Sequence, residues 1–429
     1  MQPGGITLKE NKKIKWSKLD NASKIFPPTT TNRDTKVFRL SCELTEDVDP
    51  ESLRKALSPT LESFPFYRSV LRRGAFWYYF EASDLEPVVE EESKPICAPL
   101  YIKEEKSLLF RVLYFRNRIS VEIFHALSDG AGAIWFFETL IYHYMTIKYR
   151  ELLPQDFPYI SHKASMSQKT ADSFEKTYYK RTGGEVVEKA PSAKAYQLRG
   201  SKVEENRTKL IEGTLSAKKV LDLAHEYDTT MTIFLTALYF YAINKDMPSK
   251  MRKKPVVLQV PINLRQYFES RTARNFFGTM NIQYDFSKQS HDLHDIIASV
   301  GESFKKELTK EKINAHLDEL MSLEKNPFAR IIPLPLKDIA LKTANFLGDR
   351  HITSSISNVG RIVMPKALEP FIKKFSIFVS ARRPQIVICS YLDELVINFI
   401  SPYHDTDIQR IFFQFLTEHG INVAISSNL

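Results

Sequence analysis

The sequence is poor in cysteine and glycine. Its 429 residues include three cysteines and 14 glycines, with 43% hydrophobic and 26% charged residues. Cys42, Cys97 and Cys389 stand far apart and form no CxxC pair, which excludes a disulfide framework and a cysteine-based metal site. We expect three free thiols in a reducing compartment, in a globular protein of ordinary composition.

Long apolar runs are also missing. The longest, at residues 231–243, is too short to span a bilayer and is typical of a buried helix. The N-terminus (MQPGGITLKENKKIKW) has no apolar core ahead of its charges, which excludes a secretory signal peptide. We therefore expect a monomeric, cytoplasmic protein without a transmembrane segment.

Positive charge is not concentrated in one place. The net charge is +9, but the basic residues are spread over residues 9–18, 163–209 and 245–254 and the pair Arg382 and Arg383. No segment interleaves clustered arginines with aromatic residues as a nucleic-acid groove does, so nucleic acid is not an expected partner. This excess of positive charge would suit the binding of a small molecule that carries several phosphates.

Three common catalytic signatures are absent: the GxSxG nucleophile elbow, the GxxxxGK[ST] phosphate loop and the HExxH zinc site. His291 and His294 lie three residues apart on a predicted helix, but a third ligand is missing. A solvated helix face is therefore favoured over a metal site. We expect neither a metal nor a bound cofactor.

Strand and helix patterns alternate in two blocks of similar element order. Strands are predicted at 37–44, 67–71, 76–81, 108–115 and 119–124, and then at 210–215, 256–262, 277–286, 352–358, 375–380, 386–392 and 395–400. Helices are predicted at 50–64, 133–149, 216–226, 230–244, 293–323 and 406–419. The pattern indicates an α/β protein.

A stretch rich in Lys, Ser, Thr and Glu separates the two blocks. It contains Gly183, Gly184 and Pro191 and is typical of an exposed crossover, with one helix expected at 167–180. Because single cores stop growing at about 250–300 residues, a chain of this length is expected to divide. We predict an N-terminal subdomain at 1–155, a linker at 156–207 and a C-terminal subdomain at 208–429.

The sharpest chemical signal is the segment His125-Ala126-Leu127-Ser128-Asp129-Gly130, which directly follows a predicted strand. An imidazole has a pKa suited to removing a proton from a weak nucleophile during acyl transfer. Asp129 can fold back across the turn that Gly130 permits and fix the loop. Taken alone, the pattern fits equally a hydrogen-bonded histidine before an ordinary Asp-Gly turn.

Motifs in the second block favour a catalytic role for the His125 segment over an ordinary Asp-Gly turn. A predicted strand ends in Val260-Pro261-Ile262-Asn263-Leu264-Arg265; Asn275-Phe276-Phe277-Gly278 opens another, and Ser357-Asn358-Val359-Gly360 follows. The order HxxxDG, NLR, NFFG and SNxG resembles the chloramphenicol-acetyltransferase-like superfamily. Within it, the sequence is most similar to alcohol acetyltransferases and to peptide-synthetase condensation domains. The resemblance covers nearly the whole chain, although the DFGWG motif of plant members is absent.

The resemblance implies two mixed-sheet subdomains with an active-site tunnel between them. His125 would face the tunnel as the general base, and Asp129 would be structural, paired with Arg265 from the other half. Asn275 and Gly278 would shape the strand where the halves meet, or simply its entry turn. Ser357 and Asn358 are the candidates for stabilising the oxyanion of the tetrahedral intermediate, in competition with Ser354 and Ser355.

The expected activity is direct transfer of an acyl group from acyl-CoA to the hydroxyl or amine of a small, apolar acceptor. No activated serine or cysteine is recognisable beside the histidine, in agreement with direct attack. Two alternatives stay open. The donor could be an acyl carrier protein, or the chain could be a non-catalytic member that binds a ligand or partner in the same tunnel.

Overall fold

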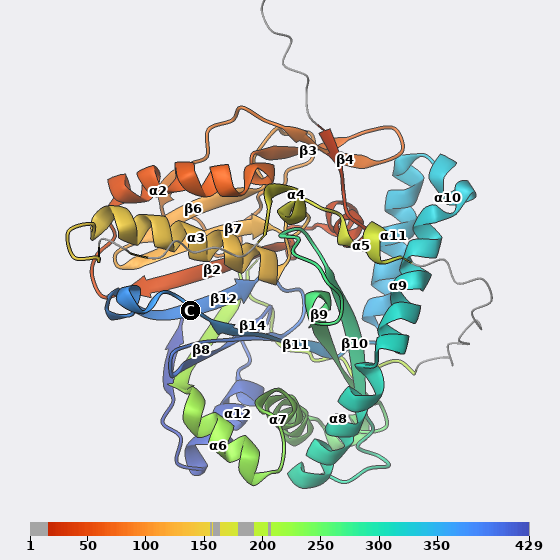
Figure 1. Cartoon of the computed structure of the whole chain (residues 1–429). Coiled ribbons are helices and arrows are strands. Elements are labelled where there is room, and N and C mark those ends of the chain that lie inside the picture. Colours follow the sequence, from red (N-terminus) through yellow and green to blue (C-terminus); the bar gives the residue numbers. More distant parts are fainter. Residues whose placement is uncertain (1–15, 155–156, 158–163, 179–192, 205–206, 429) are drawn as a thin grey trace, which may run out of the picture.

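The computed structural model describes residues 16–154, 157, 164–178, 193–204 and 207–428 (Figure 1). Part of the predicted linker, including Gly183, Gly184 and Pro191, lies outside the described residues. The rest of the chain folds around three sheets. Two large hydrophobic cores form, each of them beside one of the two larger sheets.

The first large sheet has five strands in the order β12-β2-β7-β6-β5. These strands are β12 (Ile372–Val379), β2 (Val37–Leu44), β7 (Arg118–Phe124), β6 (Phe110–Phe115) and β5 (Val89–Glu91). Apolar and polar residues alternate along β7, but Ser120 and Glu122 on its polar face are buried too. Glu122 accepts hydrogen bonds from Arg39 Nε (2.8 Å) and Arg111 Nε (2.7 Å), so the polar face is covered by paired charges.

Two helices cover this sheet and pack against each other: α2 (Pro50–Ser63) and α3 (Gly130–Lys148). Asp49 caps α2 by accepting a hydrogen bond from the backbone N–H of Ser52, and Pro50 occupies the first turn, where its missing N–H costs nothing. A small antiparallel sheet lies beside them and consists of β1 (Trp16–Lys18), β4 (Tyr78–Ala82) and β3 (Ser69–Arg73).

The second large sheet has seven strands in the order β10-β9-β11-β13-β14-β8-β15. Their bounds are β10 (Phe277–Tyr284), β9 (Val256–Asn263), β11 (Ser354–Ile362), β13 (Gln385–Tyr391), β14 (Glu394–Ser401), β8 (Lys209–Ser216) and β15 (Ala424–Ser427). Strand β11 runs parallel to β9 and β13, and the other pairs are antiparallel.

Helices cover the lower face of this sheet in Figure 1: α6 (Ala217–Glu226), α7 (Met231–Asp246), α8 (Leu293–Glu307) and α12 (Asp407–Glu418). Helix α7 contains the apolar run noted in the sequence, and it lies among the others with most of its residues buried. No helix of the described residues has both the length and the hydropathy needed to cross a membrane.

Strand β12 links the two halves. After β11 the chain leaves the seven-stranded sheet and pairs with β2, placing Phe375 opposite Cys42 and Ile377 opposite Leu40. It then returns to the seven-stranded sheet as β13. In Figure 1, the blue β12 lies beside the red β2. The division at 156–207 remains a prediction, and β12 belongs by sequence to the last segment but by pairing to the first sheet.

The remaining helices lie at one side of the molecule and around the seam, which is the region where the two halves meet. They are α1 (Phe26–Thr29), α4 (Met166–Lys169), α5 (Ser173–Thr177), α9 (Lys310–Lys325), α10 (Pro327–Ile331) and α11 (Leu334–Asp349). The single helix predicted at 167–180 is two short helices, because Asp172 caps a new one with its side chain; residues 179 and 180 lie outside the described residues. Helix α11 was not predicted.

Candidate active site

His125 is the first residue after β7, at the seam between the halves. Its backbone N–H donates to the carbonyl of Lys36 at 2.8 Å, which ties the residue to the segment before β2. Its ring stacks on Phe26 with centroids 4.4 Å apart and lies against Phe38 and, from β10, Phe277. The imidazole is therefore held on three sides by aromatic rings, while part of its surface stays accessible.

Asn275 determines which ring nitrogen of His125 is basic. The Nδ2 of Asn275 donates to the carbonyls of His125 (3.0 Å) and Ala126 (3.3 Å), and this orients its Oδ1 toward the Nδ1 of His125 at 3.3 Å. A carbonyl oxygen can only accept, so Nδ1 carries the proton. The lone pair is then on Nε2, as a base requires.

Burial lowers the pKa of His125 below its usual value. The hydrogen bond to its own backbone carbonyl, the charge of Asp129 and the hydrogen bond that the ring donates to Asn275 raise the pKa, but they do not outweigh desolvation. The imidazole is thus neutral at neutral pH, which is the protonation state that can accept a proton.

Asp129 joins the two halves through a buried ion pair. Its carboxylate accepts from Arg265 Nη1 at 2.8 Å and Nη2 at 3.1 Å, a two-point contact. It also caps α3 by accepting from the Gly132 N–H at 2.9 Å, and it accepts from the Phe276 N–H at 2.8 Å. The carboxylate faces these donors rather than the imidazole, so its contacts are structural.

Arg265 also holds the segment that carries Asn275. It lies in a short 3-10 turn just after β9 and donates to the carbonyls of Thr272 (2.9 Å), Arg274 (2.6 Å) and Phe276 (3.3 Å). Because Asn275 lies within this segment, the guanidinium fixes the backbone that presents the Asn275 amide to His125.

The glycine that the motif requires sterically is Gly132 rather than Gly130. A Cβ on Gly130 would find its nearest neighbour, Val359, at 4.0 Å, and the backbone at Gly130 is not in the left-handed region. A Cβ on Gly132 would lie 2.0 Å from the carbonyl oxygen of Ala273 and 2.6 Å from Ser128 Oγ. The close approach of the two halves at Ala273 therefore leaves no room for a side chain.

A buried polar chain supports Asn275 from behind, and the sequence did not reveal it. Asn275 Nδ2 donates to Ser23 Oγ at 3.0 Å; the Ser23 hydroxyl lies 2.6 Å from Asp20 Oδ1, and Asp20 pairs with Arg274 at 3.4 Å. Burial raises the pKa of Asp20 to about 6. Asp20, Ser23 and Phe26 precede the first predicted element and have no local pattern that marks them.

Besides Asn275, the NFFG segment contacts the histidine through Phe277 and not through Gly278. Gly278 pairs with Ile262, and a Cβ there would point at Leu264, 3.5 Å away in the core of the second half. Successive strand residues face opposite sides, so Phe277 is turned toward His125, with ring centroids 5.6 Å apart. Gly278 thus faces away from the imidazole.

The oxyanion candidates on β11 separate by face. Asn358 donates to Thr232 Oγ1 of α7 at 2.9 Å, so its amide points away from the seam. Ser357 pairs with Val387, whose side chain belongs to the core of the first half, and so it faces the seam. Ser354 forms hydrogen bonds with the Tyr239 hydroxyl and the carbonyl of Pro384, and Ser355 donates a hydrogen bond to the side chain of Gln385. Ser357 is the one candidate of these four without such a bond among the described residues.

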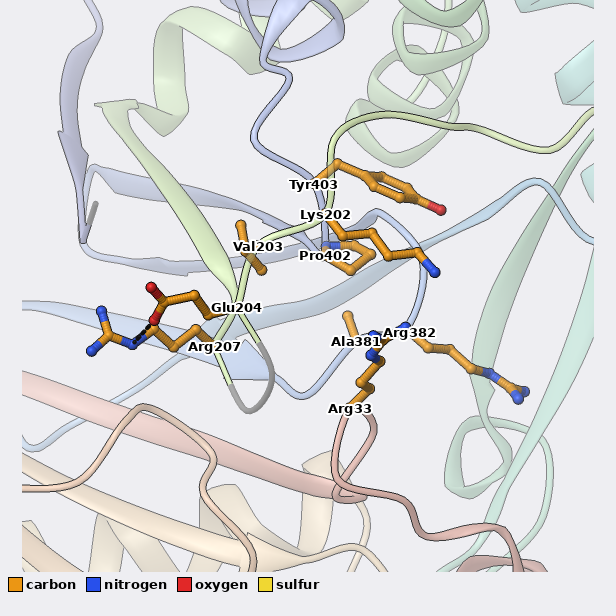
Figure 2. Close-up of a pocket in the computed structure, with 9 residues that line it drawn as sticks. All are labelled: Arg33, Lys202, Val203, Glu204, Arg207, Ala381, Arg382, Pro402 and Tyr403. Atoms are coloured by element: carbon orange, nitrogen blue, oxygen red, sulfur yellow. Dashed lines mark ion pairs between the residues drawn. The ribbon is translucent and has the colours of Figure 1, made fainter.

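A cavity of about 150 Å³ lies between the two halves (Figure 2). Its lining includes Arg33, Lys202, Arg207 and Arg382. Figure 2 shows Glu204 and Arg207 paired at one side, with Lys202 and Arg382 at the other. Within the described part of the chain, Arg33 and Lys202 form no ion pair, so the cavity presents uncompensated positive charge.

We compared the sequence and the overall structure of the chain with those of known proteins. No protein-family model and no curated protein matches the sequence. The structure is similar to TRI3 trichothecene 15-O-acetyltransferase from Fusarium sporotrichioides, at 11% identity and a TM-score of 0.62, with 94% of each chain covered. It is also similar to F. graminearum TRI101 complexed with coenzyme A and T-2 mycotoxin, at 11% identity and a TM-score of 0.63, over 92% of this chain and 96% of that one.

A third neighbour is the starter condensation domain of rhizomide synthetase RzmA in complex with C8-CoA. It has 12% identity and a TM-score of 0.58, with 93% of this chain and 94% of that one covered. The chain has the chloramphenicol-acetyltransferase-like fold. In this fold, His125 and the Asp129–Arg265 pair lie at the seam of the two halves.

The structure offers no metal site in the part of the chain that it describes. No three His, Cys, Asp or Glu side chains are placed there to hold a metal. His291 precedes α8 and bonds Asn244, and the His294 ring lies against Tyr227. The three cysteines are free, as predicted, and the structure shows that all three are buried.

Proposed function

We propose that the chain is an acyltransferase that transfers an acyl group from acyl-CoA to the hydroxyl or amine of a small, apolar acceptor. The observation that carries this proposal is the imidazole of His125, whose Nδ1 faces the Asn275 oxygen and whose Nε2 is left as the base. The TRI101 neighbour was solved with coenzyme A and RzmA with C8-CoA, which supports a CoA thioester as donor.

The reaction follows from this geometry. Nε2 of His125 removes the proton of the acceptor hydroxyl as its oxygen attacks the thioester carbonyl. The tetrahedral intermediate collapses by breaking the carbon–sulfur bond, and the CoA thiolate takes the proton back from the imidazolium. The products are an ester and free CoA, and the acyl group is never bonded to the protein.

We assign the oxyanion-stabilising role to Ser357 rather than Asn358. Ser357 faces the seam, whereas the Asn358 amide is bonded to Thr232 on the far side of β11. A Ser357→Ala variant should lower kcat by roughly a hundredfold, the usual cost of removing one oxyanion donor, with little change in KM. Asn358→Ala should lower stability instead, because it leaves Thr232 and the Gly360 N–H without that partner.

The basic cavity is our proposed site for the phosphates of the donor. Arg33 lies three residues before Lys36, whose carbonyl accepts from the His125 N–H, so the cavity adjoins the segment that holds the base. Phosphate oxygens accept charge-assisted hydrogen bonds from such side chains. Replacing both Arg33 and Lys202 by Ala should raise KM for acyl-CoA about tenfold.

The test is an assay of free-thiol release with acetyl-CoA and longer acyl-CoAs, against a panel of alcohols and amines, with the products identified by mass spectrometry. Acyl-pantetheine, which lacks the nucleotide phosphates, serves as a second donor. The Arg33/Lys202 double variant should lose efficiency with acyl-CoA and not with acyl-pantetheine, and Arg361→Ala, at an exposed arginine on β11, should change neither. If thiol is released only from an acylated carrier protein, that protein and not CoA is the donor. If no donor releases thiol, the proposal is contradicted.

A further inference from the structure

Helix α11 exposes an apolar surface that nothing in the catalytic proposal uses. Only Leu334 of its 16 residues is buried. We call the following residues the α10–α11 face, each between 40% and 70% exposed: Ile331, Ile332, Leu336, Ile339, Phe346 and Leu347. Large side chains in such a contiguous arrangement mark an interaction site in a folded protein.

The spacing makes this face one continuous stripe. Leu336, Ile339 and Phe346 are three and seven residues apart, with the exposed Thr343 between the last two, so they lie on one side of α11. Ile331 and Ile332, which are also exposed, lie in the segment just before α11. A surface helix normally turns such a stripe toward the core; here the stripe is turned outward.

Two aromatic residues continue the face. Phe76 and Trp77, in the turn between β3 and β4, are 44% and 38% exposed. The Leu334 N–H donates to the carbonyl of Ala75 at 2.8 Å, and Lys337 Nζ lies 3.5 Å from the Trp77 ring centroid. Figure 1 shows this hairpin next to the upper end of α10 and α11. Trp beside Lys at the edge of an apolar surface is typical of a membrane–water interface.

The charges around the face are positive. The cationic residues of the segment that forms α10 and α11 are Arg330, Lys337, Lys342 and Arg350. The two carboxylates of α11 point inward: Asp338 accepts from Tyr78 OH at 3.0 Å, and Asp349 pairs with Arg382 and Arg383. A basic rim around an apolar stripe complements anionic lipid headgroups.

The same rim argues against a second copy of this chain as the occupant. A two-fold contact would bring the lysines of both copies together across a self-complementary interface. Like charges brought close together in this way are destabilising. Lysine is also depleted in the interfaces that proteins form with one another.

Helix α11 is connected to the proposed base through α1. Helix α11 packs against α1, and Phe26 of α1 stacks on the His125 ring at 4.4 Å. We propose that the α10–α11 face binds the surface of an anionic lipid bilayer, with α11 lying in the interface, and that a lipophilic acceptor reaches His125 from that bilayer past α1. The second half of this proposal rests on the proposed acyl transfer; the first half does not.

The test is co-sedimentation with vesicles of phosphatidylcholine containing about one third phosphatidylserine, beside vesicles of phosphatidylcholine alone. The wild-type chain should bind the anionic vesicles, and salt should weaken the binding. Ile339→Glu and Phe346→Glu place a charge at exposed positions where no core contact is lost, and each should lower binding tenfold or more. Leu221→Glu, at an exposed leucine of α6, is the matched control and should bind as wild type.

Binding is measured separately from catalysis. His125→Ala should bind vesicles as wild type, so a failed activity assay leaves the binding result standing. The two Glu variants should keep their activity toward a water-soluble acceptor and lose it toward one dissolved in vesicles. Absence of binding to anionic vesicles, or equal binding by the Glu variants, would overturn the proposal. A dimer in solution that these variants dissociate would show that a second copy covers the face.

Discussion

Removing Arg265 is the sharpest structural test of how the two halves are joined. In Arg265→Met, the Asp129 carboxylate keeps the N–H groups of Gly132 and Phe276 but loses both guanidinium contacts, at 2.8 and 3.1 Å. Both side chains are about 5% exposed, so solvent cannot replace the lost partner. Breaking a buried pair from one side costs about 3–5 kcal/mol, a large part of a typical total stability of about 5–15 kcal/mol.

Urea denaturation of the purified variants measures this cost. Arg361→Met, at an exposed arginine, should change the free energy of unfolding by less than about 0.5 kcal/mol. Adding Asp129→Asn to Arg265→Met removes the stranded charge, so the double variant should cost less than the sum of the single ones by at least about 1 kcal/mol. A cost below about 1 kcal/mol for Arg265→Met, or strictly additive effects, would refute the view that this pair joins the halves.

Three further predictions concern the motif and its surroundings. Gly132→Ala should lower the free energy of unfolding by more than about 3 kcal/mol, because its Cβ meets the Ala273 backbone. Gly130→Ala should lower it by less than about 1 kcal/mol, and equal melting temperatures of the two variants would contradict this expectation. Burial raises the pKa of Glu138 from 4.5 to about 7. Between these two pH values the folded state keeps a proton that the unfolded state has lost, so the free energy of unfolding should fall as the pH rises from 4.5 to about 7. Glu138→Gln should abolish this slope and, at pH 8, stabilise by on the order of 2 kcal/mol in urea denaturation; an unchanged slope would count against it. Since burial lowers the pKa of His125, the acid limb of kcat/KM should have its midpoint below 6.5, and a midpoint above that value would contradict a desolvated base.

One contact between distant segments could be predicted from the family resemblance, whereas the other contacts around the histidine could not. The Asp129–Arg265 pair was expected from the family resemblance, and the structure contains it. The Asn275 contact to the His125 ring was not expected in that form, since it depends on how the two halves approach. Ser23 and Asp20 reach the site from the far N-terminal segment, and no periodicity reports such a contact.

The elements missed by the sequence patterns have physical explanations. Prolines at 327, 333 and 335 resemble helix breakers, but each lies before or within the first turn of α10 or α11, where its missing N–H costs nothing. Strand β12 was predicted as a strand, yet local sequence does not say which sheet a strand joins. The steric requirement was assigned to Gly130, because a turn was expected there; it falls on Gly132, because the Ala273 backbone packs against that position.

The most direct test of the central claim is kcat/KM for acyl transfer by His125→Ala, beside Arg361→Ala as an exposed control, with the donor and acceptor that the wild-type chain uses best. We expect a loss of roughly a hundredfold or more for His125→Ala, the usual cost of removing a general base, with an unchanged melting temperature and no loss in the control. Transfer that survives the loss of His125 at nearly the wild-type rate would contradict the assignment of this residue as the base.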